Sequence, residues 1–144
     1  MLGGVWIVPL TKTGEIVLIR QFRYPVQQWS LELPAGGIRA GQTPEEVARA
    51  ELKEEIGGTA ERLEFFASFQ TMNSLGNEQA HVFIASGVTL GAVKHEPTEY
   101  LELHPTPLDE ALAMARANRI HDSRSAYALL LAEPKLRELA KVNL

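Results

Sequence analysis

Residues 43–58 carry signals for both ends of one α-helix, and this segment constrains the fold more than any other. Thr43 supplies a hydroxyl at the N-cap position, Pro44 stands at the first helical position, and Glu46 completes a capping box. The glycine pair at residues 57–58 then provides a stop signal. We therefore predict a helix from Pro44 to about Ile56.

Short β-rich runs lie on both sides of this helix in the sequence. Residues 5–10 and 15–22 are separated by the turn-forming segment 11–14, which predicts a β-hairpin over residues 5–23. Further strands are predicted at residues 31–33, 63–71, 79–86 and 100–103, and the glycine-containing residues 34–37 are predicted to form a loop. Further helices are predicted at residues 108–117 and 123–132, with a final short helix starting at Pro134.

This order of elements predicts the fold class. Strands precede and follow the first helix, and the remaining helices come last. We expect an α+β fold, an α/β/α sandwich in which a central mixed β-sheet is covered by helices on both faces. With no internal repeat or low-complexity linker, residues 1–144 are expected to form a single domain.

Charge and composition exclude several classes of function. The 144 residues contain 14 Lys and Arg against 18 Asp and Glu, and the formal charge of −4 disfavours binding of nucleic acid through its phosphates. Without cysteine, the chain has no disulfide or thiolate nucleophile, and any metal must be bound by oxygen or histidine. Residues 1–10 lack the pattern of a signal peptide, and no stretch has membrane-spanning character. We therefore expect a cytoplasmic protein with no nucleic-acid partner and no membrane partner.

Three glutamates, Glu51, Glu54 and Glu55, lie on one arc of the predicted helix. No Lys or Arg stands three or four residues away, so the like charges repel by roughly 0.2 to 0.5 kcal/mol per pair. Two interpretations remain open. The arc is either a solvated acidic face screened by salt, or a site where a hard cation such as Mg²⁺ supplies the missing charge. In the second case, residues 36–37 bring backbone close to the ion.

The residues around this arc resemble the Nudix box of the nucleoside-diphosphate hydrolases. The positions that agree with this signature are Gly36, Glu51, Leu52, Glu54, Glu55 and Gly57. Three positions differ, because Gln42 stands where the family has Glu, Ala50 where it has Arg, and Gly58 where it has a hydrophobic residue. We interpret Gln42 and Ala50 as a compensated pair, since losing an acid and a base together leaves no orphan charge.

The resemblance extends beyond the box. Residues 20–25, 31–37 and 107–111 are similar to the corresponding segments of the ADP-ribose and nucleotide-sugar pyrophosphatase branch. This branch implies a Nudix fold and Mg²⁺-dependent hydrolysis, with Mn²⁺ as a substitute ion. Many of its members dimerise through extra N-terminal strands, which this chain is expected to lack, so the resemblance leaves a homodimer open.

The resemblance also implies a role for each matching carboxylate. Glu51 and Glu55 match the principal metal ligands of the family, with help from the carbonyl of Ala35. Glu54 is expected to bind the metal or to orient a ligand. An extra glutamate from a loop after the box often acts as a base or ligand in this branch. The candidates here are Glu96 and Glu99, and we prefer Glu99 because it adjoins a predicted strand.

The substrate-binding candidates lie near the predicted loop and turns. Arg23 can bind a phosphate with two parallel hydrogen bonds, although an ordinary surface position is the alternative. Gly36 and Gly37 allow the backbone to approach the substrate. Glu78 is a candidate for contacting the metal or a ribose, against the alternative that it caps a turn.

These assignments imply a hydrolase that cleaves the pyrophosphate bond of a nucleoside diphosphate sugar. ADP-ribose is the leading substrate, with a nucleoside monophosphate and a sugar phosphate as products. Because the box contacts only the shared phosphates, another nucleotide sugar such as GDP-mannose, or a non-standard nucleoside triphosphate, is a second interpretation. A third is a module that binds a nucleotide sugar without cleaving it, suggested by Gln42, Ala50 and Gly58. In each case the expected partner is a small nucleotide.

Overall fold

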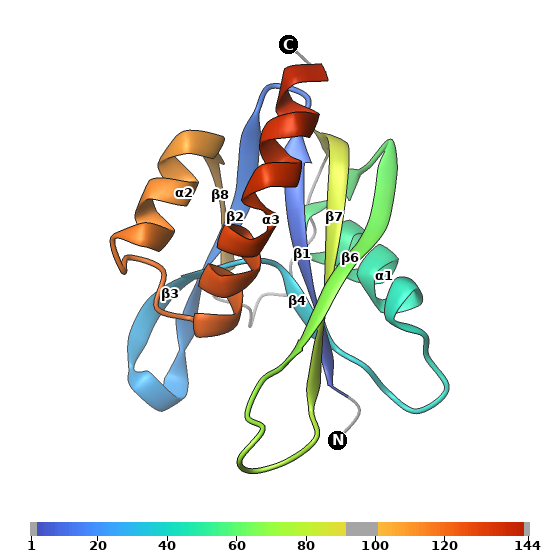
Figure 1. Ribbon diagram of the computed structural model, residues 1–144, viewed down its shortest axis with the longest axis vertical. Coiled ribbons are helices and arrows are strands. Elements are labelled where there is room, and N and C mark those ends of the chain that lie inside the picture. Colours follow the sequence, from blue (N-terminus) through green and yellow to red (C-terminus); the bar gives the residue numbers. More distant parts are fainter. Residues whose placement is uncertain (1–2, 92–100, 143–144) are drawn as a thin grey trace.

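Figure 1 shows the computed structural model of the chain, which describes residues 3–91 and 101–142. Its strands form one sheet and consist of β1 (Gly4–Thr11), β2 (Glu15–Arg23), β3 (Gln28–Glu32), β4 (Ala35–Gly37), β5 (Gly58–Thr59), β6 (Arg62–Gln70), β7 (Gln79–Leu90) and β8 (Leu101–Pro107). The helices are α1 (Pro44–Ile56), α2 (Leu108–Arg116) and α3 (Ser123–Val142), with a 3₁₀ turn at Tyr24–Val26. None of the helices in these described ranges is both long enough and apolar enough to cross a membrane.

The sheet is mixed, as the sequence predicts. β1 runs parallel to β7, with Ile7 opposite Phe83, whereas the other strand pairs in the described residues are antiparallel. The main path of strands is β3-β2-β1-β7-β5, while β4 pairs with β1, β6 with β7 and β8 with β2. The predicted hairpin is confirmed, because β1 and β2 pair antiparallel with Leu10 opposite Ile16. All residues of β1 are buried, which places this strand in the centre of the fold.

Different helices cover the two faces of β1, because successive side chains of a strand point to opposite sides of a sheet. Val5 and Ile7 pack in one cluster with Leu52 and other apolar residues of α1. Val8 lies in a second cluster, which includes Leu129 and further residues of α2 and α3. In Figure 1, α3 crosses in front of the sheet and α1 lies behind it. The predicted α/β/α arrangement is therefore confirmed.

The structure corrects the prediction for the C-terminal helices. A single helix, α3, runs from Ser123 to Val142 and contains Pro134 in its interior, where two helices are predicted. An interior proline costs about 3 kcal/mol, because it removes one hydrogen bond and crowds the preceding turn. The helix nevertheless continues because Leu129, Ala132 and Leu136 are all fully buried on the same face. Core packing on both sides of Pro134 outweighs the local preference to stop.

Strand β8 also extends further than predicted. It continues through Pro105 and Pro107, although proline cannot donate a backbone hydrogen bond. β8 lies at an edge of the sheet, where it pairs with β2, and an edge strand tolerates missing donors. The predicted residues Glu96 and Glu99 precede β8 and lie outside the described residues.

Candidate active site

A short strand, β4, lies where the sequence predicts a loop. It pairs antiparallel with the start of β1, and Gly36 is opposite Val5. The loop prediction is wrong at these residues because glycine has little strand propensity of its own, and the pairing depends on the neighbouring edge of β1. The predicted close approach is confirmed, since a Cβ atom on Gly36 would collide with the carboxylate of Glu51. The missing side chain therefore lets α1 place an acid against the backbone of β4.

Glu51 and Glu55 form a close acidic pair, one turn apart on α1. A hydrogen bond links their carboxyl groups, and the backbone of Ala35 also hydrogen-bonds to Glu55. Burial, and after it the charge and the hydrogen bond of Glu51, raise the pKa of Glu55 to about 8, although the Ala35 hydrogen bond and the positive charge of Arg23 act in the opposite direction. Two acids this close do not both ionise readily without added positive charge nearby. The oxygen donors and the unmet negative charge suit a divalent cation.

Glu54, the third glutamate of the predicted arc, is exposed to solvent. In residues 3–91 and 101–142, no group of three His, Cys, Asp or Glu side chains gathers in a way that could hold a metal ion. The structure thus brings two of the three glutamates together with β4. The role of Glu54 stays a prediction, as do those of Glu96 and Glu99.

Arg23, at the end of β2, forms a two-pronged ion pair with Glu32, at the end of β3. Its Nε lies 2.9 Å from one carboxylate oxygen of Glu32 and a terminal nitrogen lies 2.6 Å from the other. Glu32 is only 5% exposed. The hydrogen bonds to Glu32 raise the pKa of Arg23, although burial acts in the opposite direction. Sequence analysis missed Glu32. The pattern that could have identified it is a single acid between two leucines, at residues 31 and 33.

One cavity brings most of the predicted substrate-binding residues together. Its volume is about 580 Å³, and we call it the site cavity. The predicted residues that line it are Arg23, Ala35, Gly36, Gly37 and Glu78. Glu51 and Glu55 contact two of these lining residues, because Glu51 lies against Gly36 and Glu55 hydrogen-bonds to the backbone of Ala35. Residues from four separate stretches of the sequence therefore meet at one place.

Glu78 has a structural contact as well as a position in the site cavity. The hydroxyl of Thr71 donates a 2.9 Å hydrogen bond to its carboxylate, and the backbone N–H of Thr71 donates to its carbonyl. Glu78 therefore closes the connection between β6 and β7, which is the structural alternative considered for it. Glu78 nevertheless also lines the site cavity.

The start of α3 supports the segment that leads into β4. The hydroxyl of Ser125 donates a 2.6 Å hydrogen bond to Asp122 and accepts one of 2.9 Å from the backbone N–H of Leu33. Ser125 is fully buried, and Asp122 also accepts hydrogen bonds from Arg124. Sequence analysis missed this network. The pattern that could have indicated it is an Asp three residues before a Ser at the start of a helix. The network fixes the backbone two residues before Ala35.

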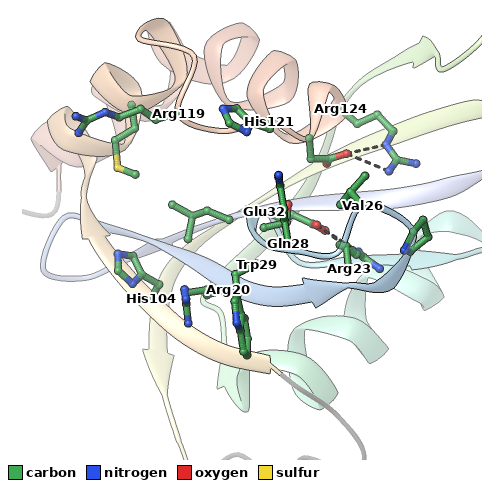
Figure 2. Close-up of a pocket in the computed structure, with 15 residues that line it drawn as sticks. Arg20, Arg23, Val26, Gln28, Trp29, Glu32, His104, Arg119, His121 and Arg124 are labelled. Carbon is green, nitrogen blue, oxygen red and sulfur yellow. Dashed lines mark hydrogen bonds and ion pairs between the residues drawn. The ribbon is translucent and has the colours of Figure 1, made fainter.

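A second cavity, of about 780 Å³, adjoins the site cavity and shares Arg23, Glu32 and Arg124 with it. Figure 2 shows its lining, with Arg119, His121 and Arg124 on the α2–α3 side and His104, Arg20 and Trp29 on the sheet side. We call it the arginine cavity. Its residues were not predicted as a group, because they become neighbours only when α2, α3 and the connection between these helices pack against the sheet.

The side chain of Gln42, which departs from the Nudix signature, has a local partner. Its Oε1 accepts a 2.9 Å hydrogen bond from the backbone N–H of Arg39. Ala50 is exposed on α1. Gln42 therefore stabilises the turn before α1, and the interpretation of Gln42 and Ala50 as a compensated pair stays a prediction.

Comparisons with known proteins show what this chain is similar to. The model of the NUDIX domain matches residues 2–130. An ADP-ribose pyrophosphatase of Bacillus subtilis is 33% identical over 129 residues, which cover 88% of this chain and 70% of the relative. A methanol dehydrogenase activator of Bacillus methanolicus shows the same identity and coverage. The crystal structure of an ADP compounds hydrolase has a TM-score of 0.82 at 24% identity, over 94% of this chain and 73% of that chain, which shows a shared fold.

Proposed function

Because this chain belongs to the NUDIX domain family, we propose that it hydrolyses the pyrophosphate bond of a nucleoside diphosphate sugar. ADP-ribose is the first candidate, because an ADP-ribose pyrophosphatase is among its relatives. The products are then a nucleoside monophosphate and a sugar phosphate. The observation that carries the proposal is the acidic pair of Glu51 and Glu55, which contacts β4 at a wall of the cavity that Arg23 also lines.

Nudix hydrolases generally use divalent metal ions. In this chain Glu51, Glu55 and the carbonyl of Ala35 would hold the ion, and we propose Mg²⁺, with Mn²⁺ as a substitute. The donor set fits, because it offers oxygen atoms and a negative charge that raises the pKa of Glu55. A bound ion would neutralise the pyrophosphate and favour ionisation of water.

The remaining side chains bind and orient the substrate. Arg23 donates N–H groups toward a phosphate while Glu32 fixes its guanidinium from behind. The backbone at Gly36 and Gly37 lets the phosphates approach β4 without a side chain in the way. Glu78 accepts a hydrogen bond from a ribose hydroxyl, and Glu54, Glu96 and Glu99 are the candidates for receiving the proton of the attacking water.

The hydrolysis needs only the substrate and one water molecule as reactants. The oxygen of water forms a bond to one phosphorus atom, and the bond from that phosphorus to the bridging oxygen breaks. The bridging oxygen leaves with the other phosphate. Removing the proton from the attacking water requires a base, and stabilising the leaving phosphate requires positive charge.

The test is hydrolysis of ADP-ribose, GDP-mannose and deoxynucleoside triphosphates with Mg²⁺, followed by detection of the released phosphate esters. We expect selective cleavage of a nucleoside diphosphate sugar. Glu55→Gln should lower turnover by at least about 100-fold, which corresponds to roughly 3 kcal/mol in the barrier. Glu110→Gln is the matched control, because Glu110 is an exposed residue of α2 that lines neither cavity.

Two outcomes would contradict the proposal. The first is that no nucleoside diphosphate sugar is cleaved while a nucleotide sugar still binds, which favours a binding module. The second is full turnover in Glu55→Gln, which would show that the reaction does not depend on the acidic pair.

A further inference from the structure

Apart from Arg23, the arginine cavity contains positively charged side chains that the hydrolysis proposed above does not use. Its arginines are Arg20, Arg23, Arg119 and Arg124, and its carboxylates are Glu32 and Asp122. The chain as a whole has a formal charge of −4, so this local excess of positive charge runs against the overall balance. An excess of positive charge in a cavity attracts an anionic ligand.

Both carboxylates of the cavity are already neutralised by arginines. Glu32 pairs with Arg23 through two hydrogen bonds, at 2.6 and 2.9 Å. Asp122 accepts hydrogen bonds of 3.0 and 3.1 Å from Arg124. These two pairs are drawn with dashed lines in Figure 2. The remaining positive charge therefore comes from the other two arginines.

Arg20 and Arg119 provide this excess. Arg20 contacts Glu102 at 3.4 Å, but both side chains are exposed, and such a pair contributes little. Arg119 is exposed and forms no ion pair with any of residues 3–91 and 101–142. The guanidinium groups of both residues are thus available for a phosphate, which arginine binds with paired N–H donors.

The cavity also offers a flat surface and apolar contacts. The guanidinium carbon of Arg20 lies 4.3 Å from the centre of the Trp29 ring, and Trp29 is 42% exposed. Leu31 and Met114 add apolar lining. A planar base can pack on such a surface, and the volume of about 780 Å³ leaves room for a nucleoside.

The arginine cavity is continuous with the place where we put the reaction. Arg23, Glu32 and Arg124 line both cavities, so they form the boundary between them. A ligand whose pyrophosphate lies over Gly36 and Gly37 can therefore extend its other end past this boundary. One substrate molecule would occupy both cavities.

We propose that the arginine cavity binds a phosphomonoester on the nucleoside half of the substrate. The preferred substrate then carries a third phosphate, separate from the pyrophosphate that is cleaved. This inference rests on the proposed function for the reaction, but the binding of the third phosphate has its own measurement. Arg20, on the sheet side, and Arg119, on the α2–α3 side, attract that phosphate into the cavity, while Arg23 and Arg124 stay paired with their carboxylates.

The test is calorimetric titration with AMP, adenosine 2′,5′-bisphosphate and adenosine 3′,5′-bisphosphate. We expect one of the bisphosphates to bind at least about tenfold more tightly than AMP. Hydrogen bonds between arginine and a charged phosphate contribute enough free energy for a difference of this size. The double variant Arg20→Ala with Arg119→Ala should lose this preference. Arg62→Ala is the control, because Arg62 pairs with Glu64 on β6 and lines neither cavity, so this variant should keep the preference.

Equal affinities for AMP and both bisphosphates in the wild-type protein would overturn the inference. So would a preference that survives in the double variant, provided that its melting curve shows a folded protein. Since both arginines are at least partly exposed, we expect the double variant to fold.

A second readout separates this inference from the proposed function. The ratio of kcat/KM for 2′-phospho-ADP-ribose to that for ADP-ribose should exceed one if the 2′-bisphosphate is preferred, and should fall in the double variant. If neither compound is cleaved but the bisphosphate preference persists, the proposed function fails and the phosphate subsite stands. If ADP-ribose is cleaved but no bisphosphate is preferred, the subsite fails and the proposed function stands.

Discussion

Two groups of buried or partly buried carboxylates near β4 differ in how their charge is balanced. Glu51 and Glu55 lie against each other on α1, and the pKa of Glu55 is raised to about 8 by burial and by its neighbour. Glu32 and Asp122 each have an arginine within hydrogen-bonding distance. The first group is therefore hard to ionise fully unless a cation binds, whereas the second group stabilises the surrounding structure. Function and stability are assigned to different acids, which contact either β4 or the network around the segment leading into it.

The largest expected effect on stability comes from breaking a matched pair. Glu32→Ala leaves Arg23 without its partner and should lower the free energy of unfolding by about 2 kcal/mol, since the half-exposed Arg23 recovers some solvation. Glu55→Gln instead replaces a carboxyl group that is hard to ionise beside Glu51, so it should leave stability unchanged or raise it. Urea unfolding of both variants measures the contrast. An equal loss in both would show that the two groups do not differ in the way we describe.

Glu102→Ala serves as the control for Glu32→Ala. Glu102 also pairs with an arginine, Arg20, but both of these side chains are exposed. We expect a change of less than about 0.5 kcal/mol, because exposed ion pairs contribute little. A similar loss for Glu102→Ala would mean that burial does not account for the effect.

The next effect concerns the network beneath the site. Ser125→Ala removes the acceptor for the N–H of Leu33 and a donor to Asp122, and leaves buried polar groups unsatisfied. We expect a loss of about 1.5 kcal/mol in the free energy of unfolding. Ser123→Ala, at an exposed position on the same helix, should change it by much less. If Ser125→Ala is as stable as Ser123→Ala, the network does not fix the approach to β4.

A smaller effect should follow from adding the ion that the acidic pair is proposed to bind. Mg²⁺ at several times its dissociation constant should stabilise the protein by about 1 kcal/mol, because the ion binds only the folded state. The rise in melting temperature should disappear in Glu51→Gln, since this variant lacks one of the two carboxylates. An equal rise in wild type and variant would place the ion elsewhere.

The smallest expected effect is the loss of stability at acidic pH that results from protonation of Asp122. Burial alone would raise the pKa of Asp122, but the hydrogen bonds from Ser125 and Arg124 hold it below its ordinary value. A carboxyl group with a lowered pKa in the folded state contributes stability that is fully present above about pH 5 and is lost as the pH falls through about 4 and below. Asp122→Asn should therefore be destabilised at neutral pH, and the difference from wild type should shrink toward pH 3. Thermal melting between pH 7 and pH 3 measures this difference, and a constant difference would contradict the linkage.

The helix α1 illustrates how much the sequence can predict. Its bounds, Pro44 and Ile56, the capping box at Thr43 and the left-handed Gly57 at its end are all confirmed. These features depend on hydrogen bonds between residues close in sequence, so they can be derived without knowledge of the fold. The spacing of Glu51 and Glu55 follows from the same helix geometry.

The matching of charges could not be predicted in this way. Glu32 and Arg23 belong to different strands, and nothing in their spacing fixes the hydrogen bonds between their side chains. Ser125, which is hydrogen-bonded to Asp122, contacts Leu33 across 92 positions of sequence. The register of a sheet and the packing of α3 determine these contacts, and both depend on the whole core.

The sequence by itself determined the capped helix, the position of its acids and the resemblance to a family, because each depends on local spacing. Only the tertiary structure decided that Gly36 belongs to a strand against Glu51, that α3 continues through Pro134, and that four arginines line one cavity. The physical reason is the same in each case. Contacts between distant segments form together with the core, and their energies outweigh the local preferences of single residues.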